Sequence, residues 1–199
     1  MPHWEDDDAC GEFFAFAHDV IDAGRLRLEA RFVQHGSTST LLHSIAVAAH
    51  AEAMAYAMGY TARLDEVRRA ALLHDYYLYD WHEGGPQAAG HATRHAGRAL
   101  KNALADYPDL TVRERDAIRC HMFPVTPVPP RYGVGWLVTC ADKLCATRET
   151  FVRVGLAYPR LRQLCARYMP DVDLGVTGRP ASELVGARHA GKRVEEGAC

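Results

Sequence analysis

The segment at residues 68–77 reads RRAALLHDYY, so an apolar helical stretch ends on the adjacent pair His74 and Asp75. A neutral imidazole and a carboxylate on adjacent residues can both bind one divalent cation. Leu72 and Leu73 precede the pair and are expected to be buried, and a buried carboxylate needs a partner charge or a metal ion. The pair therefore predicts a helical fold that encloses a metal centre.

Four further candidate ligands lie in other predicted helices or at their ends, namely His43, His95, His121 and Asp142. Asp142 is embedded in the apolar segment WLVTCADKLCA, where an unpaired carboxylate would be costly. Its neighbour Lys143 is not expected to pair with it, because adjacent helical residues do not face each other. His91 lies one helical turn before His95, so either or both could point into the centre. Eleven histidines in 199 residues add weight to the set.

Nearly every periodic segment has the helical spacing of 3.6 residues, and strand signals are poor, which predicts an all-α fold. Helices are expected over residues 13–24, 25–33, 40–58, 65–75, 91–104, 111–121, 135–152 and 161–168. The hydroxyls at 37–39 and Asp65 are expected to cap two of these helices. Thr111 and Glu114 form the pattern of a capping box.

The length predicts one domain, and a hydrophobic content of 48% is ample for its core. Residues 1–27 are expected to form an N-terminal helix that packs on the core, although its apolar stripe would equally suit a homodimer contact. Residues 28–168 are expected to form the metal-containing domain. Residues 169–199 are Gly-rich and weakly periodic, which predicts a loosely structured tail.

Composition excludes several other classes. A formal charge of −2 gives no basic patch for nucleic acid, and no apolar run approaches the roughly 20 residues of a membrane span. The six cysteines include no CxxC pair, and the acidic start MPHWEDDDAC does not resemble a secretory signal. We therefore expect a cytoplasmic protein with reduced thiols, in which Cys140 and Cys145 are small core residues.

Three segments in order, LLHSIAVAAHA, AALLHDYYLYDW and CADKLCATRE, carry His43, the His74–Asp75 pair and Asp142. Together they resemble the HD-domain superfamily of metal-dependent phosphohydrolases, over about Leu28 to Phe151. The resemblance implies a helical bundle with a metal centre in its core. It also implies hydrolysis of a phosphoester or phosphoanhydride in a small phosphorylated substrate, with nucleotides among the candidates.

The spacing of the later histidines resembles that of two-metal members of this superfamily. The implied ligands are His43, His74, Asp75 and Asp142 for one divalent ion, and Asp75, His95 and His121 for a second. The segment HAGRALKNA resembles the helix of the fifth ligand, which favours His95 over His91. Asp75 would be catalytic because it bridges both ions. Imidazole and carboxylate ligands suit iron, manganese, zinc or nickel, and the sequence does not distinguish among them.

Several other residues are candidates for contact with the substrate. His35 lies in QHGSTS and resembles a QHG segment of uncharacterised relatives; it would either donate a proton to the leaving group or cap the following helix. Lys143 and Arg148 lie on the helix of the last ligand and would bind phosphate, although simple solvent exposure is an equal expectation. Arg94 and Arg131 are weaker candidates for the same role.

Two other functions stay open. A ligand-binding or signalling module would keep the metal without turnover, and a di-iron oxygenase would use similar ligands. The position of Lys143 directly after the last aspartate, together with the ordinary hydrolase spacing, favours the phosphohydrolase.

Overall fold

The computed structural model describes residues 7–36, 38–83, 90–151 and 157–175, and this part of the chain is mostly helical, as predicted. Its longer helices are α1 (Asp7–Ala23), α2 (Thr40–Ala57), α3 (Leu64–Leu73), α4 (His91–Asp106), α5 (Val112–Cys120), α6 (Gly133–Phe151) and α7 (Pro159–Tyr168). Short elements join them, namely η2 (Leu26–Arg31), β1 (Val33–His35), β2 (Thr38–Ser39), η3 (Thr61–Arg63) and η4 (Trp81–Glu83).

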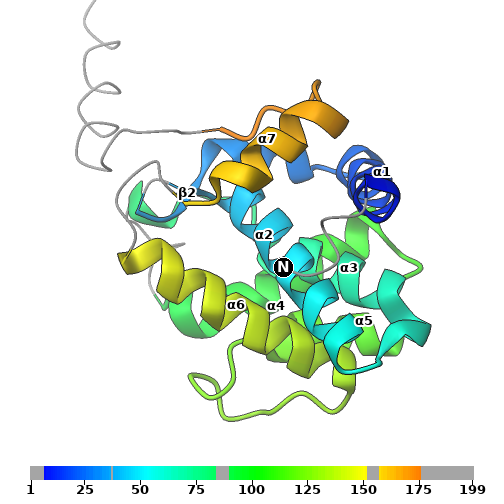
Figure 1. Ribbon diagram of the computed structural model, residues 1–199. Helices are drawn as coiled ribbons and strands as arrows, with labels where there is room; N and C mark the ends of the chain where they lie inside the picture. Colours follow the sequence, from blue (N-terminus) through cyan, green and yellow to red (C-terminus); the bar gives the residue numbers. More distant parts are fainter. Residues whose placement is uncertain (1–6, 37, 84–89, 152–156, 176–199) are drawn as a thin grey trace, which may run out of the picture.

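Helix α2 runs through the middle of the molecule, with α3 and α6 packed along it (Figure 1). Most of its residues are buried and many are alanines, and a helix that is apolar around its whole circumference belongs inside a core. The small side chains let the neighbouring helices approach closely. The Ser39 hydroxyl accepts a hydrogen bond from the Leu42 amide and caps the helix. The predicted hydroxyl cap is therefore confirmed at Ser39.

The apolar face of α1 belongs to the core of its own chain. Phe13, Phe14 and Ile21 are fully buried, and the Phe14 ring stacks on Tyr168 of α7 at 5.3 Å. The N-terminal helix therefore packs on the core, as expected.

A short ribbon replaces part of the helix expected over 25–33. The 3-10 turn η2 is followed by β1, which pairs antiparallel with β2 and has an irregularity in register between Val33 and His35. Strands of three and two residues are too short to show the alternation by which strands are recognised. The ribbon places Gln34 and His35 beside α2.

The expected cap at Asp65 is wrong. Helix α3 begins at Leu64, and Asp65 lies within its first turn. A carboxylate there favours the helix through the partial positive charge of its N-terminus. The Asp65 carboxylate also contacts the Arg68 guanidinium at 3.5 Å.

The cysteines within the described residues are all free thiols, as expected. Cys145 is a buried core residue, but Cys140 is exposed on the outer face of α6, which corrects the expectation that both are buried. Cys199 lies outside the described residues. Among the helices that are described, none combines the length and the apolar character needed to cross a membrane.

The first residues of the expected tail are part of the folded domain. Met169 and Val172 are buried in the main core. Asp171 contacts His18 of α1 and the guanidinium of Arg27. Residues 169–172 therefore belong to the folded domain and not to a loose tail. Residues 176–199 lie outside the described part of the chain.

The capping box of α5 is present as predicted. The Thr111 hydroxyl accepts from the Glu114 amide at 3.3 Å, and the Glu114 carboxylate accepts from the Thr111 amide at 2.6 Å. Helix α5 packs on α3, α4 and α6 and ends directly before His121. The box therefore fixes the start of the helix whose other end carries a candidate ligand.

We expect Thr111→Ala to lower the free energy of unfolding by about 1 kcal/mol, because one amide at the helix start loses its acceptor. Urea denaturation followed by circular dichroism measures this loss. Thr147→Ala is the matched control, since Thr147 is exposed in α6 and its hydroxyl donates only to the Lys143 carbonyl. Equal stability of Thr111→Ala and the parent chain would contradict the expectation.

Candidate metal centre

Six candidate ligands meet in the core, and all six are buried. They come from five separate parts of the helical fold: His43 from α2, His74 and Asp75 from the end of α3, His95 from α4, His121 from the end of α5, and Asp142 from α6. Leu72 and Leu73, expected to be buried before the pair, are fully buried. The convergence predicted from the sequence is therefore present.

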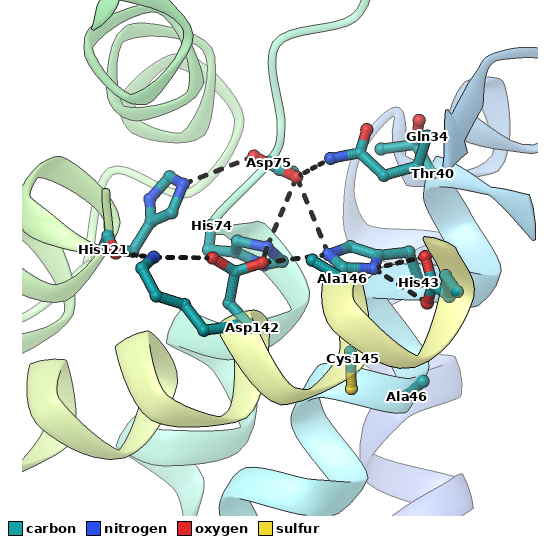
Figure 2. A network of polar contacts seen from close by, with 12 residues as sticks. Gln34, Thr40, His43, Ala46, His74, Asp75, His121, Asp142, Cys145 and Ala146 are labelled. Atoms are coloured by element: carbon teal, nitrogen blue, oxygen red, sulfur yellow. Dashed lines mark hydrogen bonds and ion pairs between the residues drawn. The ribbon is translucent and has the colours of Figure 1, made fainter. Parts of the chain in front are cut away.

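Asp75 lies at the centre of this cluster (Figure 2). Its Oδ1 atom is 3.2 Å from His95 Nε2 and 3.5 Å from His121 Nε2. Its Oδ2 atom is 3.4 Å from His74 Nε2 and 3.9 Å from His43 Nε2. The two oxygens of one carboxylate therefore face two different pairs of imidazoles.

Asp142 approaches the cluster from α6. Its Oδ1 atom is 3.3 Å from His43 Nε2 and 3.7 Å from His74 Nε2. Its Oδ2 atom accepts from Lys143 Nζ at 3.2 Å, and the same ammonium donates to the His121 carbonyl at 3.0 Å. The expectation that Lys143 would not contact Asp142 is wrong, because the long lysine side chain brings Nζ to both Asp142 Oδ2 and the His121 carbonyl.

The four imidazoles of the cluster share one hydrogen-bonding pattern. Each Nδ1 atom faces an oxygen: Ala71 O from His74 at 2.7 Å, His91 O from His95 at 2.8 Å, Ile118 O from His121 at 2.9 Å, and the Glu149 carboxylate from His43 at 3.0 Å. Such oxygens only accept, so Nδ1 carries the hydrogen. In a neutral ring Nε2 then keeps its lone pair. All four lone pairs are directed into the cluster.

The polar atoms inside the cluster fit a bound cation. His43 Nε2, His74 Nε2 and Asp75 Oδ1 are buried and have no hydrogen-bond partner within the described residues. His95 Nε2 and His121 Nε2 lie 3.0 Å apart, and two lone pairs at that distance repel unless a proton or a cation lies between them. Buried polar groups of this kind require a partner. The imidazole and carboxylate groups of this cluster could hold a metal ion.

The charges of the cluster depend strongly on one another. Burial alone would lower the pKa of His74, but Asp75 and Asp142 outweigh it and raise the pKa to about 10. Burial would also lower the pKa of His43. Glu149 and Asp142 outweigh this effect, so the pKa lies well above its usual range. The pKa of Asp75 lies well below its usual range because the surrounding imidazoles overcome the effect of burial. Without a cation, protonated imidazoles balance the carboxylates, and a metal ion would displace those protons.

Two residues of the centre were not predicted. The fully buried carboxylate of Glu149 accepts from His43 Nδ1 and fixes the orientation of that ring. Glu149 lies two helical turns after Asp142, which places both acids on the same face of an apolar helix. This spacing could have predicted Glu149 from the sequence. Gln34 on β1 donates from its amide nitrogen to Asp75 Oδ2 at 2.5 Å. That contact joins residues 41 positions apart and has no local signal.

Of the two histidines on α4, His95 and not His91 belongs to the cluster within the described residues. The Nδ1 atom of His91 contacts the Tyr79 hydroxyl at 2.8 Å, and the His91 ring stacks on that of His95 at 4.6 Å. His91 therefore supports the ring of His95 from outside, whereas His95 Nε2 contacts Asp75 directly.

The other candidates lie around the cluster at different distances. The partly exposed ring of His35 is 5.8 Å from the ring of His43, centroid to centroid. His35 does not cap α2, because Ser39 does. The guanidinium of Arg148 lies over the Tyr158 ring at 5.2 Å and is therefore engaged in packing away from the ligands. Arg94 and Arg131 are exposed.

The pKa shifts predict how the stability of the metal-free protein depends on pH. The raised pKa of His74 stabilises the folded protein fully at pH values below about 6.5, the pKa of histidine in the unfolded chain. This stabilisation is lost as the pH rises towards about 10. The lowered pKa values of Asp75 and Asp142 stabilise the folded protein at pH values above about 4, the pKa of aspartate in the unfolded chain. This stabilisation is lost in acid. We expect the urea concentration at the unfolding midpoint of chelator-treated protein to decrease as the pH rises from about 6.5 to about 10.

The metal-loaded protein is the control for this experiment. Its imidazoles are already deprotonated, so the alkaline loss should be absent, while protons should compete with the metal in acid. A metal-free protein that is equally stable at both ends of the alkaline range would contradict the charge balance described for the cluster.

The chain was also compared with known proteins. No protein-family model matches it, and no match was found among curated proteins or solved structures. The chemistry of the centre therefore has to be inferred from the side chains that form it.

Proposed function

We propose that this chain is a metal-dependent phosphohydrolase of the HD type, which cleaves a phosphoester or phosphoanhydride of a small molecule such as a nucleotide. The observation that supports it is the position of Asp75. One buried carboxylate presents its two oxygens to two separate pairs of imidazole Nε2 atoms. That arrangement suits two divalent ions that share one bridging ligand.

In this proposal His43, His74, Asp75 and Asp142 hold one ion, and Asp75, His95 and His121 hold the other. When bound, a pair of divalent cations lowers the pKa of the attacking water and balances charge on the phosphoryl oxygens. The nitrogen and oxygen donors suit iron, manganese, zinc or nickel. Within the described residues, no cysteine belongs to the cluster.

Lys143 is the group best placed to bind the phosphoryl group. Its side chain is 37% exposed, and Nζ lies 3.2 Å from Asp142 Oδ2 at the edge of the cluster. An ammonium in this position can turn towards solvent and donate to a phosphoryl oxygen while it stays beside the ligand. Arg148 is left out of the proposed site, because its guanidinium lies on Tyr158.

His35 is the proposed proton donor to the leaving group. Burial, followed by the nearby charge of His43, lowers its pKa, so the ring is neutral in the free protein at neutral pH. A dianionic phosphate close to the ring would favour the protonated form and raise the pKa again. The proton would then pass to the leaving oxygen as its bond to phosphorus breaks.

We expect Asp75→Asn to reduce phosphate release by about 100-fold or more, because loss of metal binding removes several kcal/mol of transition-state stabilisation. The assay measures phosphate released from nucleotides and simple phosphoesters with manganese or iron. Asp106→Asn is the matched control, since Asp106 pairs with Arg25 and Tyr76 outside the cluster.

Other outcomes of that assay would identify other functions. A shift in melting temperature on ligand binding, with no phosphate release from any substrate, would indicate a binding or signalling module. Oxygen consumption that requires reduced iron would indicate an oxygenase. Phosphate release that survives Asp75→Asn would exclude the proposed centre as its source.

We expect His35→Gln to slow hydrolysis of alkyl phosphates by about 100-fold, because their alkoxide leaving groups need a proton. Hydrolysis of p-nitrophenyl phosphate should change little, since that leaving group departs without one. The comparison of kcat for the two substrates measures the effect. His18→Gln on α1, away from the cluster, is the control. Equal slowing of both substrates would remove His35 from the role of proton donor.

A further inference from the structure

The side chain of Gln34 joins the ribbon to the centre of the ligand cluster. Gln34 lies on β1 and is 7% exposed. Its amide nitrogen donates to Asp75 Oδ2, and its amide oxygen accepts from the Tyr77 hydroxyl. Figure 2 shows Gln34 approaching Asp75 from the side opposite to His121. Gln34 therefore contacts the carboxylate that faces both pairs of imidazoles.

The orientation of this amide is fixed by its two partners. The Asp75 carboxylate only accepts hydrogen bonds, so the nitrogen of the amide must face it. The oxygen then faces the Tyr77 hydroxyl, which donates to it. The same hydroxyl lies 3.3 Å from Thr40 Oγ1 at the start of α2. The result is a directional chain of hydrogen bonds that runs from the Tyr77 hydroxyl through the Gln34 amide to Asp75.

This chain restricts the rotation of the Asp75 carboxylate. With Oδ2 held by Gln34, Oδ1 has to point to the opposite side, where His95 and His121 lie. Without Gln34, the terminal torsion of an aspartate is soft. The carboxylate could then turn both oxygens towards one pair of imidazoles.

We propose that Gln34 is a positioning residue that holds Asp75 in its bridging orientation, so that both halves of the metal centre are complete at the same time. Tyr77 acts through Gln34 by fixing which end of the amide faces Asp75. The inference rests on the two-ion centre of the proposed function, but it concerns metal binding and not turnover. It is therefore tested without a substrate.

The test uses the full chain and Mn²⁺ as the probe. Equilibrium dialysis gives the number and affinity of bound ions, and electron paramagnetic resonance shows whether two ions are magnetically coupled through a shared ligand. We expect the parent chain to bind two coupled ions. Gln34→Leu should bind the second ion about 10- to 100-fold more weakly, as is usual when a group that orients a ligand is lost. Its spectrum at low Mn²⁺ should be that of a single uncoupled ion.

A second variant keeps the inference testable if Gln34→Leu does not fold. Tyr77→Phe leaves the amide in place and removes only the hydroxyl that orients it, so the second ion should again be weakened and the coupling changed. In the double variant the loss should equal that of Gln34→Leu alone, because the two residues act in one chain.

Two matched controls separate positioning from general destabilisation. Gln163→Leu makes the same change at an exposed position of α7. Tyr76→Phe removes the neighbouring buried hydroxyl, which donates to Asp106 and lies outside the cluster. Tyr76→Phe is expected to lower thermal stability, and both controls should keep two coupled ions.

The outcomes distinguish this inference from the proposed function. Two coupled ions in Gln34→Leu with parental affinities would overturn the positioning role, and so would a parent chain that binds fewer than two ions. Loss of the second ion in Gln34→Leu, in a protein that hydrolyses no phosphorylated compound, would support the positioning role and refute the phosphohydrolase.

Discussion

The buried negative charge of Asp75 is the constraint to which the rest of the fold is matched. A carboxylate removed from water costs several kcal/mol unless charges or hydrogen bonds surround it. Here the surrounding imidazoles come from the adjacent residue His74 and from three other helices, so the helices must converge on one point. The alanine-rich α2 makes this convergence possible, because small side chains let α3 and α6 lie close enough for imidazoles and carboxylates to meet.

Two of the imidazoles are oriented by the same hydrogen bonds that complete the ends of their helices. His74 and His121 follow the last residues of α3 and α5, and each donates from Nδ1 to the carbonyl three positions earlier. The last carbonyls of a helix have no partner within the helix. The ring satisfies one of them, and its Nε2 lone pair is thereby turned into the cluster. At these two positions, the same hydrogen bond therefore completes the end of the helix and orients the candidate ligand.

The features that could be predicted from the sequence are those that leave a local sequence pattern. Periodicity and costly polar groups in apolar helices identified most of the helices and the candidate ligands, but left His91 and His95 as alternatives. A resemblance of motifs chose His95 and supplied its pairing with His121. Gln34 and Glu149 were missed because their partners, Asp75 and His43, are 41 and 106 positions away. The ribbon was missed because its strands are too short to alternate. Cys140 was misplaced because an apolar segment alone does not show which face of α6 is covered.

His43 differs from the other imidazoles, and the difference makes the cluster asymmetric. Its Nδ1 atom donates to the buried carboxylate of Glu149, whereas the others donate to neutral carbonyls. Asp142 approaches the same half of the cluster. Asp142 lies 3.3 Å from His43 and 3.7 Å from His74, and its ligand atom comes within 4.8 Å of that of His121. Among the imidazoles of the described cluster, Glu149 contacts that of His43. Because opposite charges attract more strongly in a buried site than in water, the half at His43 stabilises added positive charge more strongly than the other half does.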